Sequence, residues 1–124
     1  MKKKILVSIR PEYVSKILKE TKKYEYRKIV AKEKITSILI YETSPIMKVV
    51  AEVEVEDVLT YPPDILWNLT HDASGINKDF FDSYFKDRNI AHAYKLGKVK
   101  KFNEAKSLID YGIKNAPQSF VYIK

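Results

Sequence analysis

The chain has 124 residues, of which 45% are apolar and 12% are aromatic, and its formal charge is +7. This composition is typical of a globular domain and excludes a disordered or low-complexity chain. The chain contains no cysteine, which excludes disulfides and thiolate metal sites. No apolar run reaches the roughly 18 residues of a membrane span, and the run after the first lysines is too short for a signal peptide. We therefore expect one cytoplasmic domain, residues 1–124, with no membrane partner.

Nearly all of the excess positive charge lies in the first 34 residues. This segment has twelve Lys and Arg and four Glu, whereas residues 35–124 have eleven Lys and Arg and twelve Asp and Glu. Such asymmetry indicates a polyanionic partner, nucleic acid before membrane. An AT-rich coding sequence gives the same lysine excess without any function, so both explanations stay open.

The first part of the sequence predicts a strand, a helix and a second strand. The apolar run Ile5–Ile9 is typical of a buried strand. A proline in the first turn and apolar residues at helical spacing predict an amphipathic helix over residues 11–20. In the strand that follows, a period of two puts Lys23, Glu25 and Arg27 on one face and the intervening tyrosines on the other.

Three more strands follow, and two of them change phase. Residues 38–41 predict a buried strand, and residues 49–59 predict a strand whose apolar face shifts at Asp57. The stretch 93–102 changes phase in the same way at Gly97. Phase changes of this kind indicate β-bulges, and bent strands are typical of a closed or partly closed barrel.

Between the last two of these strands lie two predicted short helices. Pro63 begins one, and Asn77 is a suitable N-cap for the other. Residues 120–123 predict a closing strand. The resulting order, β-α-β-β-β-α-α-β-β, contains no regular βαβ repeat and favours an α+β fold.

Several chemical classes have no support in the sequence. Three glycines cannot form a phosphate-binding loop, and no nucleophile motif surrounds any Ser or Thr. His71 and His92 have no neighbours at metal-ligand spacing, so we expect no metal and no cofactor.

The segment from Glu20 to Arg27 has the most distinctive pattern. Three charged side chains follow the end of the predicted helix, and one is among only three arginines in the chain. The planar guanidinium of Arg binds carboxylate or phosphate through two parallel hydrogen bonds. A solvated edge strand with simple ion pairs explains the same pattern, so the residues alone do not decide.

The stretch from Ile5 to Lys28 resembles the opening of ASCH domains, a branch of the PUA-like barrels. The family signature, Gly-x-Lys-x-x-Glu-x-Arg, maps onto Glu20, Lys22, Glu25 and Arg27. Glu stands where the family has Gly, and Glu adopts a positive φ less easily, so we expect a different turn at this position.

The resemblance continues through residues 41–59, where Ala51 stands at a usual Gly, and ends with residues 116–123. It therefore covers nearly the whole chain. It implies a PUA-like, partly closed β-barrel of five or six strands with flanking short helices. It also implies a cleft, lined by the signature strand, for RNA or a nucleobase-like ligand.

On this resemblance Lys22 and Arg27 meet a phosphate or another ligand oxygen, and Glu25 accepts from a base amino group or orients Arg27. Tyr41 or Trp67 either stacks on a base or belongs to the core. The full set of expected ligand-binding residues is Arg10, Lys22, Lys23, Glu25, Arg27, Ser44, Gln118 and Ser119.

Three functions stay open. The leading one is a nucleic-acid-binding module that prefers RNA, with a role in transcription or RNA metabolism. The alternative is a small hydrolase that acts on acetylated cytidine or on RNA, with Lys22, Glu25 and Glu54 or Glu56 as weak catalytic candidates. Glu25 replaces the threonine of the hydrolase relatives, which removes the alcohol nucleophile. The third is a protein-interaction module that uses the acidic face of residues 52–56. The sequence does not indicate an oligomeric state.

Overall fold

Residues 3–124 form a six-stranded sheet and three α-helices in the computed structural model of the chain. Met1 and Lys2, which open the basic N-terminal segment, lie outside the described residues. The elements are β1 Lys4–Ile9, α1 Pro11–Leu18, β2 Tyr24–Arg27, β3 Ser37–Glu42, β4 Lys48–Tyr61, α2 Pro63–Thr70, α3 Lys78–Tyr84, β5 Ala91–Lys106 and β6 Phe120–Ile123, with short 3-10 turns at His71–Ala73 and Leu108–Tyr111.

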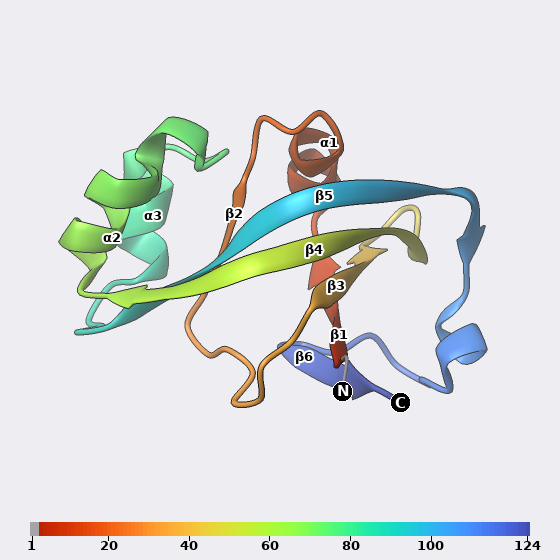
Figure 1. Cartoon of the computed structure of the whole chain (residues 1–124). Coiled ribbons are helices and arrows are strands. Elements are labelled where there is room, and N and C mark those ends of the chain that lie inside the picture. Colours follow the sequence, from red (N-terminus) through yellow and green to blue (C-terminus); the bar gives the residue numbers. More distant parts are fainter. Residues whose placement is uncertain (1–2) are drawn as a thin grey trace.

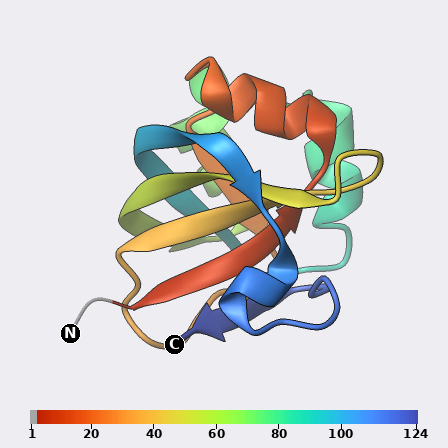
Figure 2. The same ribbon diagram turned by 90° about the vertical axis from the view of Figure 1, so that its right-hand side faces the viewer.

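The sheet has the strand order β2-β5-β4-β3-β1-β6. β1 and β3 are parallel, and the other neighbours are antiparallel. The long strands β4 and β5 curl across the molecule, and α1 lies over the curled sheet (Figures 1 and 2). Both predicted bulges are confirmed, because the register between β4 and β5 shifts beside Asp57 and beside Gly97. The α+β class and the partly closed sheet are therefore confirmed.

The sheet is buried on both faces along its central strands. Val7 of β1 and Ile40 of β3 pack in a core cluster with α1. Their neighbours Leu6 and Leu39 point to the other face and pack with residues of β6 and the second 3-10 turn. Strands buried on both faces have continuous apolar sequences, which explains why these two strands show no polar alternation.

Helices α2 and α3 form a separate layer beside β2 and β5 (Figure 1). Leu66 of α2 and Phe81 of α3 share a core cluster with Tyr26 of β2 and Ala93 of β5. The predicted cap of α3 is confirmed, because the Asn77 side chain accepts a hydrogen bond from a backbone N–H at 2.8 Å. This packing places one face of α3 beside β2.

None of the helices within residues 3–124 has the length and apolar character needed to span a bilayer.

Helix α1 ends at Leu18, two residues earlier than predicted, and the expectation of an altered turn at Glu20 is wrong. Glu20 has a φ of 62°, the left-handed conformation that Gly adopts more easily. Its N–H donates to the carbonyl of Ile17, and the N–H of Thr21 donates to the carbonyl of Lys16, both at 3.0 Å. These two bonds form a Schellman motif, which satisfies the last carbonyls of the helix. Glu therefore occupies the conformation expected of Gly.

Candidate functional site

Lys22 follows this turn and is only 3% exposed. Its Nζ donates to the carbonyl of Ser74 at 2.7 Å and lies 5.5 Å and 5.1 Å from the ring centroids of Tyr13 and Tyr26. Burial lowers the pKa of Lys22 from 10.5 to about 8, although the negative charge of Glu25 opposes this shift. One carbonyl and two aromatic rings thus hold an ammonium group that loses its proton at a lower pH than an ordinary lysine does.

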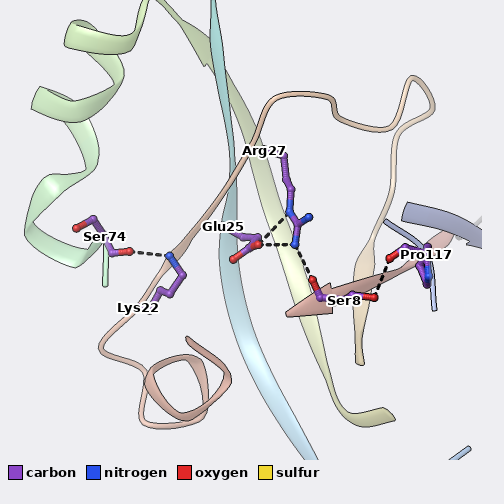
Figure 3. Close-up of polar contacts among 6 residues, drawn as sticks. All are labelled: Ser8, Lys22, Glu25, Arg27, Ser74 and Pro117. Atoms are coloured by element: carbon purple, nitrogen blue, oxygen red, sulfur yellow. Dashed lines mark hydrogen bonds and ion pairs between the residues drawn. The ribbon is translucent and has the colours of Figure 1, made fainter. Parts of the chain in front are cut away.

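Glu25 and Arg27 form an ion pair on the same face of β2. Nε and Nη2 of Arg27 lie 3.0 Å and 2.8 Å from Oε2 of Glu25. Nη2 also donates to the carbonyl of Ser8 at 2.9 Å, and the Ser8 hydroxyl donates to the carbonyl of Pro117 at 2.9 Å. Figure 3 shows this chain of contacts from β2 across the end of β1 to the segment before β6. The guanidinium plane is fixed, because Glu25 of β2 and the carbonyl of Ser8 in β1 both bind it.

The Glu25 carboxylate lies between Lys22 and the Arg27 guanidinium (Figure 3). Both contacts from Arg27 go to Oε2, and Oε1 takes part in neither. An ionised carboxylate accepts hydrogen bonds only, whereas ammonium and guanidinium groups donate only. The three side chains therefore place an acceptor between two donors.

These three residues line a cavity of about 350 Å³, a volume within the range of small-molecule pockets. Its aromatic wall consists of Tyr13, Tyr26, Phe80 and Tyr84. The rings of Phe80 and Tyr84 are nearly parallel, at 10° and with centroids 6.4 Å apart. Burial raises the pKa of Tyr26 to about 12, so its phenol stays protonated. The remaining lining residues are Ser8, Ile9, Arg10, Ile76 and Gln118.

The three residues that match the ASCH signature, Lys22, Glu25 and Arg27, thus line one cavity on the curled sheet. Residues 7–102, most of the chain, match the family model of the ASCH domain. The chain belongs to the ASCH domain family. ASCH domains have a PUA-like fold that is often linked to RNA binding.

Solved ASCH structures have the same fold as this ASCH domain. The crystal structure of a Tyr-to-Phe mutant of ZmASCH from Zymomonas mobilis has a TM-score of 0.90 and 20% identity, and the match covers 99% of this chain and 91% of that one. The ASCH structure from the same organism has a TM-score of 0.89 at 20% identity, with 98% and 87% covered. Identity at this level shows the fold alone.

Curated relatives contain a similar segment within longer proteins. ATP synthase subunit alpha of Ureaplasma parvum serovar 3 is 28% identical over 125 residues, which covers 99% of this chain and 16% of that protein. Large ribosomal subunit protein uL22 of the same organism is 29% identical over 121 residues, which covers 97% of this chain and 39% of that protein. The ASCH chain thus spans well under half the length of these two relatives.

Five of the eight residues expected to bind a ligand line the cavity of this ASCH domain. The other three lie elsewhere. Lys23 lines a different hollow, and Ser44 and Ser119 are exposed and are not among the lining residues. The five lining residues are Arg10, Lys22, Glu25, Arg27 and Gln118.

The prediction that Lys23 shares a face with Glu25 and Arg27 is wrong. β2 begins one residue later, at Tyr24, so the alternation of strand side chains does not extend back to Lys23. The N–H of Lys23 donates to the carbonyl of Ala73, and its own carbonyl accepts from Leu96, both at 2.8 Å. Lys22, which precedes this anchored residue, points to the cavity instead.

The other candidate acids lie away from the cavity. Glu54 is exposed on β4, opposite Ser37 of β3, and Glu56 lines the second hollow.

Among the described residues, no group of three or more His, Cys, Asp or Glu is arranged to hold a metal ion. His71 lies 3.3 Å from Asp72, and His92 contacts Thr60 at 2.9 Å.

The aromatic wall comes from residues that the sequence did not indicate. Tyr41 is buried in the core, and Trp67 packs on Phe81 with ring centroids 4.9 Å apart. Phe80 and Tyr84 line the cavity instead, and they come from the face of α3 that lies beside β2. Their spacing is that of an ordinary packed helix, and only the tertiary arrangement shows that they border a cavity. Ser8 was also missed, because it binds Arg27 through its backbone carbonyl.

Proposed function

We propose that residues 1–124 act as one RNA-binding ASCH domain that holds a single unpaired nucleotide in the cavity beside Arg27. The observation that carries this proposal is the acceptor between two donors, Glu25 between Lys22 and Arg27, in a cavity with an aromatic wall. Base edges present both donors and acceptors, and base faces stack on aromatic rings, so this lining is complementary to a nucleobase.

Each charged group has a role in this proposal. Glu25 accepts a hydrogen bond from an amino or imino group of the base through Oε1. Lys22 and Arg10 donate to phosphate or carbonyl oxygens. Arg27 is already bonded to two protein oxygens, so it mainly fixes the orientation of Glu25. Tyr84 and Phe80 supply the stacking surface.

The charge distribution supports a polyanionic ligand. The first 34 residues hold twelve Lys and Arg against four Glu, and Arg10, Lys22 and Arg27 of this segment line the cavity. The two named curated relatives differ in function, one an ATP synthase subunit and the other a ribosomal protein, so neither function is carried over.

Titration of fluorescein-labelled single-stranded RNA of mixed sequence, about ten nucleotides long, tests this proposal at two salt concentrations. We expect binding that weakens with salt, with a slope of about −0.7 for each phosphate contact. Because Lys cannot reproduce the fork of Arg, Arg27→Lys should weaken binding about ten-fold. Arg88→Lys, at an exposed position, is the matched control. The absence of binding at low salt would contradict the proposal.

A second candidate function is hydrolysis of a modified nucleoside or of RNA, and it rests on Lys22. A buried lysine with a pKa of about 8 loses its proton more readily than an ordinary lysine, which suits general base or nucleophilic chemistry. Against this role, no threonine lines the cavity within the described residues. Incubation with acetylcytidine, and separately with RNA, tests the two reactions. Turnover that Lys22→Ala abolishes would favour the enzyme.

A further inference from the structure

A second hollow, of about 410 Å³, lies toward the other end of α1. Ile17 and Glu20, at the C-terminal end of this helix, line it, whereas Tyr13 in the first turn lines the cavity described above. Lys22 lines both spaces. The rise from Tyr13 to Ile17 is only about 6 Å along α1, so one short ligand can reach both spaces.

The second hollow, here called the bulge hollow, lies where β4 and β5 are both irregular. In the ladder between them, β5 carries one extra residue at Gly97–Lys98, and β4 carries one extra residue at Glu56. All three residues line the bulge hollow. Bulges redirect side chains and are over-represented next to functional sites. Two bulges lie side by side here, one on each strand, and they indicate that this part of the sheet is a candidate functional site.

The bulge hollow has an excess of positive charge. Among its acids and lysines, one pair lies within ion-pair distance in residues 3–124. Lys95 and Glu56 approach to 3.9 Å, and both side chains are about half exposed. A long, exposed pair of this kind is weak. Lys23 and Lys98 form no ion pair with the described residues. The charged lining residues are Lys22, Lys23, Lys95, Lys98, Glu20 and Glu56.

We infer that the bulge hollow binds the phosphate backbone of the RNA whose unpaired nucleotide occupies the cavity beside Arg27, an inference that rests on the proposed function. Lys23 and Lys98 donate to the phosphate oxygens of the adjoining nucleotides. Lys22 lies between the two spaces and faces the nucleotide at the point where it enters the cavity. A nucleoside monophosphate fills only the cavity, whereas an oligonucleotide uses both spaces.

The double variant Lys23→Ala/Lys98→Ala tests this inference because both side chains are exposed. The probes are the labelled RNA of about ten nucleotides and, in competition with it, an equal mixture of the four nucleoside monophosphates. We expect the affinity for the oligonucleotide to fall about ten-fold and its salt slope to become shallower by about 0.7 per lost contact. The affinity for the monophosphates should change less than about two-fold. Glu56→Gln, which removes an acid from the bulge hollow, should tighten oligonucleotide binding about two-fold.

Lys114→Ala/Lys124→Ala removes the same charge at exposed positions outside both spaces and is the matched control. If both double variants bind RNA equally, or if the Lys23/Lys98 variant loses the monophosphates as severely as the oligonucleotide, the inference is overturned and the proposed function stands. If the unmodified chain binds neither probe at low salt, both are overturned.

Discussion

The side chain of Lys22 lies directly against the backbone of Gly75. A Cβ placed on Gly75 would lie 2.6–2.7 Å from the Cβ, Cγ and Cδ atoms of Lys22, closer than real side chains approach. The same short segment accepts hydrogen bonds from Nζ of Lys22 at Ser74 and from Nζ of Lys16 at Gly75. The loop before α3 is therefore fitted to the buried lysine, and the position of its ammonium depends on this loop.

Gly75→Ala should consequently destabilise the fold by about 2–4 kcal/mol, since it adds left-handed strain at a φ of 71° to the steric clash with Lys22. Urea denaturation measures this change. Gly112→Ala is the matched control, because Gly112 has a φ of 73° but no atom within 4 Å of an added Cβ, so only the strain of about 1 kcal/mol remains. Equal losses in the two variants would show that Lys22 does not occupy this space.

The buried ammonium should also make stability depend on pH. The pKa of Lys22 is about 8 in the folded state and 10.5 in the unfolded state, so between these values the unfolded state binds more protons. The free energy of unfolding that depends on Lys22 therefore rises with pH across this window, and the full cost of the buried charge is present below about pH 8.

Lys22→Met removes this titration and nearly keeps the volume of the side chain. The difference in unfolding free energy between the unmodified chain and Lys22→Met should shift by about 2 kcal/mol, in favour of the unmodified chain, from about pH 7 to about pH 9.5. Lys114→Met, at an exposed position, should give no such shift. Parallel curves for the two lysine variants would contradict the burial of a charged Lys22.

Much of the fold could be predicted from the sequence, because its patterns are local. Apolar runs and alternation located the strands, and the phase changes at Asp57 and Gly97 located the bulges. The candidate site was less predictable. The contacts of Arg27 with the backbone of Ser8, and of Ser8 with Pro117, join segments far apart in the chain through carbonyl groups. Every residue type supplies a carbonyl, so no local pattern marks these positions.

At Glu20 the residue type does not predict the backbone conformation. Its φ of 62° is unfavourable for Glu, yet the Schellman bonds hold it there. Glu20→Gly should therefore stabilise the chain by about 0.5–1 kcal/mol in urea denaturation, because Gly adopts this conformation without strain. Ser15→Gly, within α1, should instead destabilise by about 0.5 kcal/mol. A loss of stability in Glu20→Gly would contradict the left-handed turn.

The ion pair of Glu25 and Arg27 should contribute more than a surface pair, since their side chains are only 9% and 17% exposed. A double-mutant cycle with Glu25→Gln and Arg27→Lys separates their interaction from the other effects of each change. We expect a coupling energy of about 1–3 kcal/mol, because the neutral amide cannot match the charge and the lysine cannot reach both Oε2 of Glu25 and the carbonyl of Ser8.

Lys78 and Asp82 provide the comparison for this cycle, because they also approach to 2.8 Å but their side chains are 62% and 53% exposed. An exposed pair four residues apart on a helix couples by about 0.3–0.5 kcal/mol. If the Glu25–Arg27 cycle gave a value as small as this, solvent would have to screen the pair as it screens Lys78 and Asp82. The guanidinium would then not be held against β1, and Glu25 would have no fixed orientation toward a ligand in the cavity.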